Sequence, residues 1–344
     1  MKGLYKNIYV LAPYGYATGG VELAHQLVDY LRNRNQNAFI VYINGDKISS
    51  KQDITKEYSI YNISSSSYIE DKEDNILILP EVFFNQILSF KKIQVGCWWM
   101  SVDNHYKNSK ISFYDAFYYE RSIIGKIKIL LSFLLKKNYQ TKYSDKILYQ
   151  EENRITHYYQ SHYAQYHLYS KGYSKIRPLS DYINLELFGD IGKAKQNVVL
   201  YNPSKGYEFT KKIIEKLPEY KFVPLKGLTR YELKELFQTS KLYIDFGHFP
   251  GKDRLFREAA INGCCIVTGN LGASYFYEDV PISEAYKFKI NRNNIDNIIC
   301  KIKYIINNYE LCYKDFQYLR YKIMQEKEVF FNEIEELFFY KNNL

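Results

Sequence analysis

The feature that most constrains the fold is an alternation, in two separate series, of short apolar runs rich in β-branched residues and segments with helical periodicity. This alternation is typical of parallel sheets whose two faces are covered by helices. In the first series the predicted strands are 7–12, 38–43, 75–80, 93–100 and 155–160, and the predicted helices are 21–33 and 161–171. In the second series the predicted strands are 197–201, 221–225, 241–246 and 264–268, and the predicted helices are 207–217, 230–239 and 253–262. We therefore predict an α/β fold with two Rossmann-like, doubly wound domains facing a cleft.

The two series also predict the domain limits. Residues 1–182 form an N-terminal domain, with a Tyr-rich, basic helical insertion at 112–150, and residues 183–325 form a C-terminal domain. The amphipathic tail, 326–344, is predicted to be a helix that returns to the N-terminal domain. A length of 344 residues suits two such cores.

Charge and cysteine usage limit the classes of partner. The net charge of +9 favours anionic partners, namely phosphorylated metabolites, an acidic membrane surface or nucleic acid. Nucleic acid is the weakest of the three, because the sequence has neither zinc-finger spacing nor a run of five or more Lys and Arg. Five cysteines without a C-x-x-C pair indicate a reduced, intracellular protein. The apolar part of the N-terminus is too short for a signal peptide, so we expect a cytoplasmic protein.

Two glycine-containing loops follow predicted strands and open predicted helices. Backbone amides of Gly19 and Gly20 can approach an anion at a helix start, although the spacing is not the dinucleotide fingerprint and no Walker lysine follows. A tight turn that needs glycine for steric reasons is the alternative. In the loop 202–206, Lys205 can meet a phosphate that the helix dipole also favours, and the alternative is a solvated surface lysine.

The segment 245–260 has the densest charge. Lys252 and Arg254 supply cations beyond a strand, and Glu258 can accept hydrogen bonds from a diol such as ribose. Arg254 and Glu258 can instead form an i,i+4 surface pair. That alternative does not explain why so many charges crowd a Gly/Pro loop.

Three motifs together resemble the GT-B glycosyltransferases. They are Gly-Gly-Val-Glu at 19–22, Asn-Pro-x-Lys-Gly at 202–206 and Arg-Glu-Ala-Ala-x-x-Gly-Cys-x-x-x-Thr at 257–268. Within this group the chain is most similar to bacterial enzymes that build surface polysaccharides of the capsule or O-antigen type. The resemblance covers most of the chain and is best across residues 197–272.

The resemblance implies a nucleotide-sugar donor as substrate, with no further cofactor and no metal. It implies that the loop with Asn202, Ser204 and Lys205 contacts the donor pyrophosphate. Glu258 matches the second glutamate of the family's Glu-x7-Glu signature and would hold the ribose. Lys226 and Gly227 would border the base, and the loop 19–20 would face the cleft on the acceptor side.

The chain departs from the family pattern at two places. Pro250 stands where the family has its first glutamate, which contacts the donor sugar, and Asp253 is the candidate substitute. Gly251 in the same loop is a further candidate for binding the nucleotide-sugar donor. The arginine that precedes the pyrophosphate lysine is absent, and Lys252 or Arg254 is the candidate source of that charge.

On the N-terminal side, Asp103 and His105 follow a predicted strand. Either can contact the acceptor or act as a base, and a structural histidine is the alternative. We expect sugar transfer to a glycan or polyprenyl-linked acceptor in bacterial surface polysaccharide synthesis. A GT-B-like epimerase or phosphorylase is a second reading. A non-catalytic assembly partner is a third, which Pro250 favours and the pairing of Lys205 with Glu258 opposes.

Residues 123–137 form a basic amphipathic pattern. The apolar stripe consists of Ile123, Ile124, Ile127, Leu130, Leu131, Leu134 and Leu135. About fourteen helical residues reach about 21 Å, less than the ~30 Å of a hydrocarbon core, so the segment cannot cross a bilayer. Peripheral contact with the inner membrane, helped by Lys126, Lys128, Lys136 and Lys137, and packing on its own domain are the two expectations.

Overall fold

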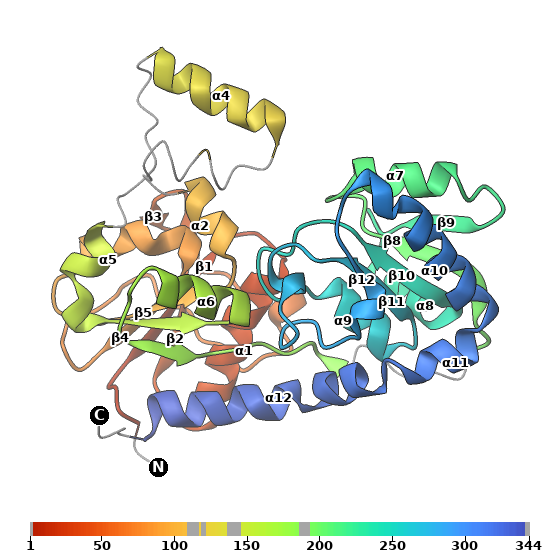
Figure 1. Ribbon diagram of the computed structural model, residues 1–344. Helices are drawn as coiled ribbons and strands as arrows, with labels where there is room; N and C mark the ends of the chain where they lie inside the picture. The colour runs from red at the N-terminus through yellow and green to blue at the C-terminus, as the bar shows by residue number, and fades with distance from the viewer. Residues whose placement is uncertain (1–2, 109–116, 118–121, 136–145, 186–192, 341–344) are drawn as a thin grey trace. The chain divides into compact units, whose positions relative to one another are not determined.

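The structure is a computed structural model that describes residues 3–108, 117, 122–135, 146–185 and 193–340. The chain divides into two compact units. Unit 1 comprises Met1–Gln160, Ala164–Ser180 and Phe330–Leu344, and unit 2 comprises Ser161–Tyr163 and Asp181–Val329. Each unit is built on one sheet (Figure 1).

Unit 1 contains a seven-stranded sheet in the order β3-β2-β1-β4-β5-β6-β7. Its strands are β1 (Ile8–Pro13), β2 (Ala38–Asn44), β3 (Lys47–Ile48), β4 (Ile76–Pro80), β5 (Gln94–Trp99), β6 (Ile155–Tyr159) and β7 (Ile176–Pro178). Only the β2–β3 pair is antiparallel. The strand order reverses between β1 and β4, which makes this a doubly wound sheet.

The helices of unit 1 are α1 (Gly19–Asn33), α2 (Val102–Asn108), α4 (Ile123–Leu134), α5 (Lys146–Gln150) and most of α6 (His162–Ser170). The long C-terminal helix α12 (Gln317–Phe338) belongs to unit 1 from Phe330 onwards. There Phe331 packs on Tyr30 with ring centroids 4.2 Å apart, and Glu335 bonds Arg34 at 2.7 Å. The prediction that the C-terminal helix returns to the N-terminal domain is confirmed.

Unit 2 contains a five-stranded parallel sheet in the order β12-β11-β10-β8-β9. Its strands are β8 (Gln196–Tyr201), β9 (Lys221–Pro224), β10 (Ser240–Asp245), β11 (Cys265–Gly269) and β12 (Lys287–Phe288). Its helices are α7 (Tyr207–Glu215), α8 (Arg230–Thr239), α9 (Leu255–Ile261), α10 (Ile295–Asn307), α11 (Tyr309–Lys314) and the first part of α12. Apolar residues of the three central strands, such as Val199, Ile244 and Ile266, are fully buried in its core.

Every predicted strand is present within two residues of its predicted limits. The strands that the sequence analysis did not identify are β3, β7 and β12, which have two or three residues each. Thr229 and Glu232 form a reciprocal capping box at the start of α8. Helix α12 begins at Gln317 rather than at residue 326, so the amphipathic tail is only its second half.

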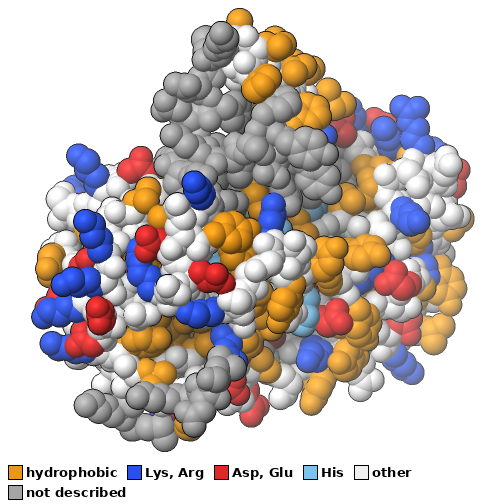
Figure 2. Space-filling view, turned by 60° about the vertical axis from the view of Figure 1, so that its left-hand side comes forward, with side chains coloured by type: hydrophobic (Ala, Val, Ile, Leu, Met, Phe, Trp, Pro, Cys, Tyr) orange, Lys and Arg blue, Asp and Glu red, His pale blue; other side chains and the backbone are white. Residues whose placement is uncertain are grey.

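Of the predicted insertion, 112–150, the structure describes α4, α5 and a few adjoining residues, and Lys136 and Lys137 lie outside the described residues. The apolar stripe of α4 and Leu135 is exposed, with exposed fractions from 42% at Leu130 to 77% at Ile123. Figure 2 shows apolar side chains in the upper part of the view, the part in which Figure 1 labels α4. In the part of the chain that the structure describes, no helix has the length and apolar character needed to span a bilayer.

Candidate functional site

The sheet of unit 2 reverses its order between β8 and β10, because the chain passes from β8 outward to β9 and then back to β10 on the other side. Ligands of open parallel sheets bind beyond the carboxyl ends of the strands at such a point. The loops that follow these two strands are in close contact there. Gly206, with φ +66°, lies so near the neighbouring loop that an added Cβ would stand 2.5 Å from the backbone nitrogen of Gly247. Only glycine suits that position.

Lys205 lies between these two loops. Its aliphatic stem rests against Gly247, where an added Cβ would come within 2.4 Å of the Lys205 Cγ, and its ammonium lies 3.8 Å from the centroid of the Phe249 ring. The ammonium bonds Asp253 at 2.5 Å and Asp245 at 3.3 Å. Burial lowers the pKa of Lys205, but the two carboxylates outweigh burial and raise it. Lys205 is therefore a fixed, charged group.

Asp245, the last residue of β10, is the buried partner of Lys205. Its carboxylate accepts hydrogen bonds from the Tyr243 hydroxyl at 2.9 Å, the Gly247 backbone at 2.9 Å and the Asn202 amide at 3.3 Å. Burial raises the pKa of Asp245 to about 6, although Lys205 opposes the shift. The sequence analysis did not place Asp245 in the site. The available signal was an aspartate that ends an apolar strand.

Asp253 is the second partner of Lys205 and lies in the loop before α9. One carboxylate oxygen accepts the Lys205 ammonium, and the other accepts the backbone N–H of Leu255 at 3.0 Å. The side chain of Asp253 is 17% exposed, whereas that of Asp245 has no exposed surface. The structure thus brings the predicted residues Asn202, Lys205 and Asp253 together around Asp245.

Arg254 and Glu258 form an i,i+4 pair along α9, with 3.1 Å between Arg254 Nη2 and Glu258 Oε1. The pair is not a simple surface contact, because the side chain of Glu258 is only 7% exposed and that of Arg254 is 25% exposed. Burial raises the pKa of Glu258, and the Arg254 guanidinium opposes that shift. The carboxylate of Asp253, a partner of Lys205, also raises the pKa of Glu258, so this pair lies near the Lys205 cluster.

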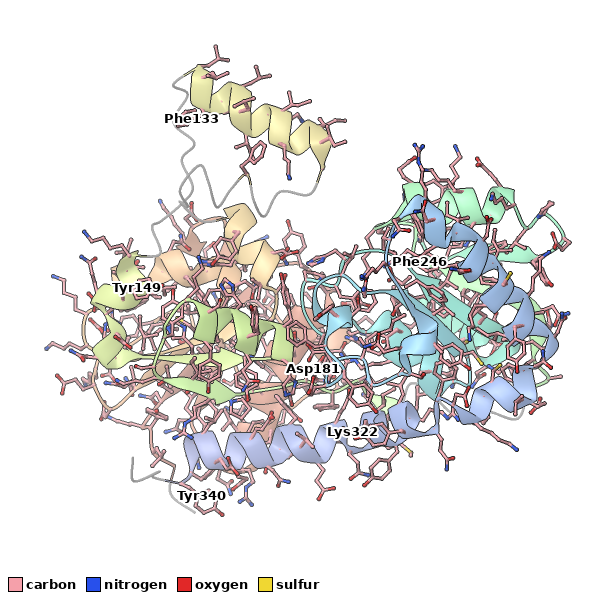
Figure 3. The ribbon with its side chains drawn as sticks, viewed as in Figure 1. Phe133, Tyr149, Asp181, Phe246, Lys322 and Tyr340 are labelled. Carbon is pink, nitrogen blue, oxygen red and sulfur yellow. The ribbon has the colours of Figure 1, made fainter. Side chains whose placement is uncertain are left out.

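Lys252 lies in a different set of contacts. Its ammonium bonds Glu326 of α12 at 2.9 Å and Asp181 at 3.3 Å. Arg257 of α9 bonds the same two carboxylates, at 2.8 Å and 2.5 Å. The four charges form a buried network, which the sequence analysis did not predict. Asp181 is labelled in Figure 3.

The remaining predicted donor residues lie at the same edge of the sheet. Lys226 and Gly227 are exposed in the loop after β9, where Gly227 has φ +67°. Ser204 is exposed, and its backbone N–H bonds the Asn202 side chain at 3.0 Å. Gly251 is buried in the loop before α9.

The candidates of unit 1 lie at the carboxyl edge of its own sheet. Gly19 and Gly20 are the first residues of α1, and Gly20 is exposed. Asp103 and His105 lie in α2, and both are buried. The His105 ring packs against Trp99 with centroids 4.7 Å apart and has no exposed surface. A role for Asp103 or His105 in catalysis stays a prediction.

Glu81 follows β4 at the reversal point of the unit 1 sheet. It is buried, and its carboxylate accepts the backbone N–H of Met100 at 3.2 Å. Burial raises the pKa of Glu81 to about 7, against hydrogen bonds from the backbone of Met100 and Ser101 and from Asn104. The carboxyl thus secures the turn that leads from β5 into α2.

The cluster in unit 2 combines an ammonium and a guanidinium with three carboxylates. Such cations bind phosphate oxygens, and the carboxylates can accept hydrogen bonds from hydroxyl groups. Across the described residues, no group of three or more His, Cys, Asp or Glu is arranged to hold a metal ion.

No profile of a known protein family matches the sequence, and the curated proteins include no match. Solved structures do match. Sucrose-phosphate synthase from Thermosynechococcus elongatus is 12% identical with a TM-score of 0.62, covering 96% of this chain and 98% of that one. HepE from Anabaena, solved with UDP and glucose, is 10% identical with a TM-score of 0.60, covering 96% and 99%.

A mutant of TarM from S. aureus also matches, at 13% identity and a TM-score of 0.48 over 77% of this chain, and the chain spans 56% of the length of TarM. The two matches that cover nearly the whole of both chains establish the fold. The chain has the GT-B fold, and the fold that the sequence motifs implied is confirmed.

Proposed function

We propose that this protein transfers a sugar from a nucleotide-sugar donor to a glycan acceptor, with the donor diphosphate bound at Lys205. The observation that carries the proposal is the placement of Lys205, a charged ammonium fixed by Gly247 and Phe249 at the reversal point of the unit 2 sheet. A fixed cation there stabilises the charge that develops on a leaving diphosphate. The shared fold with HepE, which was solved with UDP and glucose, supports the same function.

The neighbouring residues take complementary roles in this proposal. Glu258 accepts hydrogen bonds from the ribose hydroxyls, and Lys226 with Gly227 borders the base. Arg254 supplies the second cation near the diphosphate, because the Lys252 ammonium belongs to the separate buried network with Asp181 and Glu326. The transfer is metal-independent in this proposal, since Lys205 and Arg254 provide the positive charge.

The acceptor side belongs to unit 1. We propose that Gly19 and Gly20 border the acceptor and that Asp103 or His105 serves the acceptor hydroxyl. A growing glycan on a polyprenyl carrier is the acceptor we favour, and bacterial surface polysaccharide is the product. The motifs at 19–22 and 257–268 support this assignment.

A panel of nucleotide sugars tests the function. The protein should hydrolyse one of them slowly without acceptor, and the matching nucleoside diphosphate should bind the wild type and not Lys205→Ala. Lys216→Ala is the matched control, because Lys216 is an exposed lysine of unit 2 that also pairs with an aspartate. Nucleotide binding without turnover of any donor would support the non-catalytic assembly partner instead. Binding that is unchanged in Lys205→Ala would refute the site.

We also propose that α4 docks on the cytoplasmic face of a membrane. The apolar stripe predicted from the sequence is the exposed side of the helix, whereas Ile129 is buried and Ser132 is half-buried. Figure 3 shows the side chains of α4, among them Phe133, which is 57% exposed. An exposed apolar stripe of this size is rare on a soluble monomer and marks an interaction surface.

The partner we assign to α4 is a bilayer with anionic lipids. The helix has 12 residues and reaches about 18 Å, so it lies in the interface rather than across the membrane. Lys128 is exposed and Lys126 is half-buried in the same helix, and α4 contains no acidic residue. Each lysine near anionic lipid contributes about 1 kcal/mol. A polyprenyl-linked acceptor would lie in the same interface.

Vesicle co-sedimentation tests this docking. Binding should require phosphatidylglycerol in phosphatidylcholine vesicles, weaken with salt, and fall in Lys126→Gln/Lys128→Gln and in Ile124→Ser/Leu131→Ser. Lys211→Gln/Lys216→Gln and Leu311→Ser are the controls, because they remove equally exposed side chains of unit 2. Failure to bind at every salt concentration, or self-association through α4 in the absence of vesicles, would contradict the assignment.

A further inference from the structure

The ammonium of Lys205 has two carboxylate partners where one would neutralise it. Asp253 and Asp245 both bond the single positive charge. When both are ionised, this cluster has a net negative charge, and a diphosphate is repelled by such a cluster. A ligand of that class therefore binds only if one carboxylate gives way.

The two carboxylates differ in how firmly they are held. Asp245 is fully buried and bonded by the Tyr243 hydroxyl and the Gly247 backbone as well as by Lys205. Asp253 is partly exposed, and among the described residues its carboxylate bonds Lys205 and the backbone N–H of Leu255. Asp245 is the permanent partner, and Asp253 is the partner that can leave.

Lys205 keeps its direction without Asp253. Its stem is confined by Gly247, and its ammonium lies against the face of Phe249, an arrangement that attracts cations. When Asp253 swings away, the ammonium still points to the same place. A phosphate oxygen can take the position that the Asp253 oxygen occupies, with the same charge-assisted hydrogen bond.

We propose that the Asp253 carboxylate is a displaceable counter-ion, which occupies the position of a phosphate oxygen of the donor diphosphate. The donor displaces it on binding, and Asp253 returns to Lys205 as the nucleoside diphosphate product leaves. This inference rests on the proposed function. It assigns Asp253 to the release of product, in addition to the contact with the donor sugar that the missing glutamate suggests.

The proposal predicts that removing the charge of Asp253 raises the affinity for the nucleoside diphosphate. Asp253→Asn keeps the size of the side chain and an oxygen for the Leu255 N–H, and it removes the competing anion. We expect the nucleoside diphosphate to bind on the order of tenfold more tightly, with product inhibition strengthened by the same factor. If Asp253 only contacted the donor, Asp253→Asn would instead weaken binding.

Isothermal titration with UDP, ADP, GDP and inorganic pyrophosphate tests the proposal on the full chain. Asp253→Asn should bind more tightly than the wild type, and Asp253→Glu, which keeps the charge, should stay near the wild type. Asp296→Asn controls for the change in net charge, because Asp296 is an exposed aspartate that also pairs with a lysine. Melting curves of each variant establish that it is folded.

The outcomes separate the inference from the function. If Lys205→Ala loses binding and folded Asp253→Asn binds equally or more weakly than the wild type, the counter-ion role is wrong and the donor site stands. If the wild type binds a nucleotide that Lys205→Ala binds equally well, the proposed function and the inference both fail. Binding of pyrophosphate that appears only in Asp253→Asn would support the inference most strongly.

Discussion

The two sheets reverse their strand order in the same way, yet the groups at the two reversal points are different. In unit 2 the edge presents Lys205 and Arg254 among carboxylates, and their side chains are 20% and 25% exposed. In unit 1 the edge presents the glycines of α1, a buried carboxyl at Glu81 and a buried aromatic cluster around His105. The common geometry gives each unit a place for a ligand, and the side chains decide which ligand. In the proposed function the unit 2 edge binds the diphosphate, and the unit 1 edge borders the acceptor.

The largest effect should come from the buried ionic network of unit 2 around Arg257. Among the residues that the structure describes, Arg257→Met leaves Lys252 as the one cation that bonds the buried carboxylates of Asp181 and Glu326. Removing one partner from a buried ionic network costs about 3–5 kcal/mol. Urea unfolding should show that loss in the transition of unit 2. A loss below about 1 kcal/mol would mean that the network is solvated.

The second effect is a pH dependence of stability that arises from Glu81, the buried carboxyl of unit 1. Burial raises the pKa of Glu81 from its ordinary value of 4.5 to about 7 in the folded protein. Folding therefore favours the protonated form, and its contribution to stability is complete below pH 4.5 and lost as the pH rises through 7. The advantage of Glu81→Gln over the wild type should grow across this range to about 3 kcal/mol. A difference in unfolding free energy between Glu81→Gln and the wild type that does not vary with pH would contradict the raised pKa of Glu81. Other titrating groups cancel because both chains contain them.

A third effect tests the charged edge of unit 2. Lys205→Ala should lower kcat/KM by about a hundredfold, roughly 2.7 kcal/mol, because the leaving diphosphate loses a charged contact. Lys216→Ala should leave kcat/KM unchanged. Initial rates with the donor found in the panel measure both. An equal loss in the two variants would show that the effect is not specific to the site.

The smallest effect is expected at the edge of unit 1. Asp103→Asn should change the affinity for nucleoside diphosphate less than about twofold, because the proposal assigns no phosphate contact to unit 1. Titration with the nucleotide measures this directly. A tenfold loss in a folded variant would place the donor in contact with unit 1 and remove the division of roles between the two edges.

Most of the fold could be predicted from the sequence, because strand and helix periodicity are local properties. The strands at both reversal points, and the capping box of Thr229 with Glu232, required only neighbouring residues. The motifs also placed Lys205 and Glu258 at one edge. The partners of Arg257 could not be predicted, since Asp181 and Glu326 lie 76 and 69 residues from it along the chain.

The sequence also does not show which way a side chain points. Lys252 and Arg254 stand two residues apart in a Gly/Pro loop, and the sequence does not show which of them enters a buried network. For α4 the apolar stripe was evident, but a stripe fits packing on its own domain as well as an exposed surface. The exposure of Ile123 and Leu134, at 77% and 65%, favours the second reading.

The central claim is that Lys205 receives the diphosphate of a nucleotide-sugar donor. A crystal structure with the nucleoside diphosphate that binds most tightly tests it most directly, through the distance from Lys205 Nζ to the nearest phosphate oxygen. We predict a distance of about 3 Å. The ribose hydroxyls should donate hydrogen bonds to Glu258, and the Asp253 carboxylate should be turned away from Lys205. A nucleotide bound elsewhere, with Lys205 still bonded to Asp253, would contradict the account.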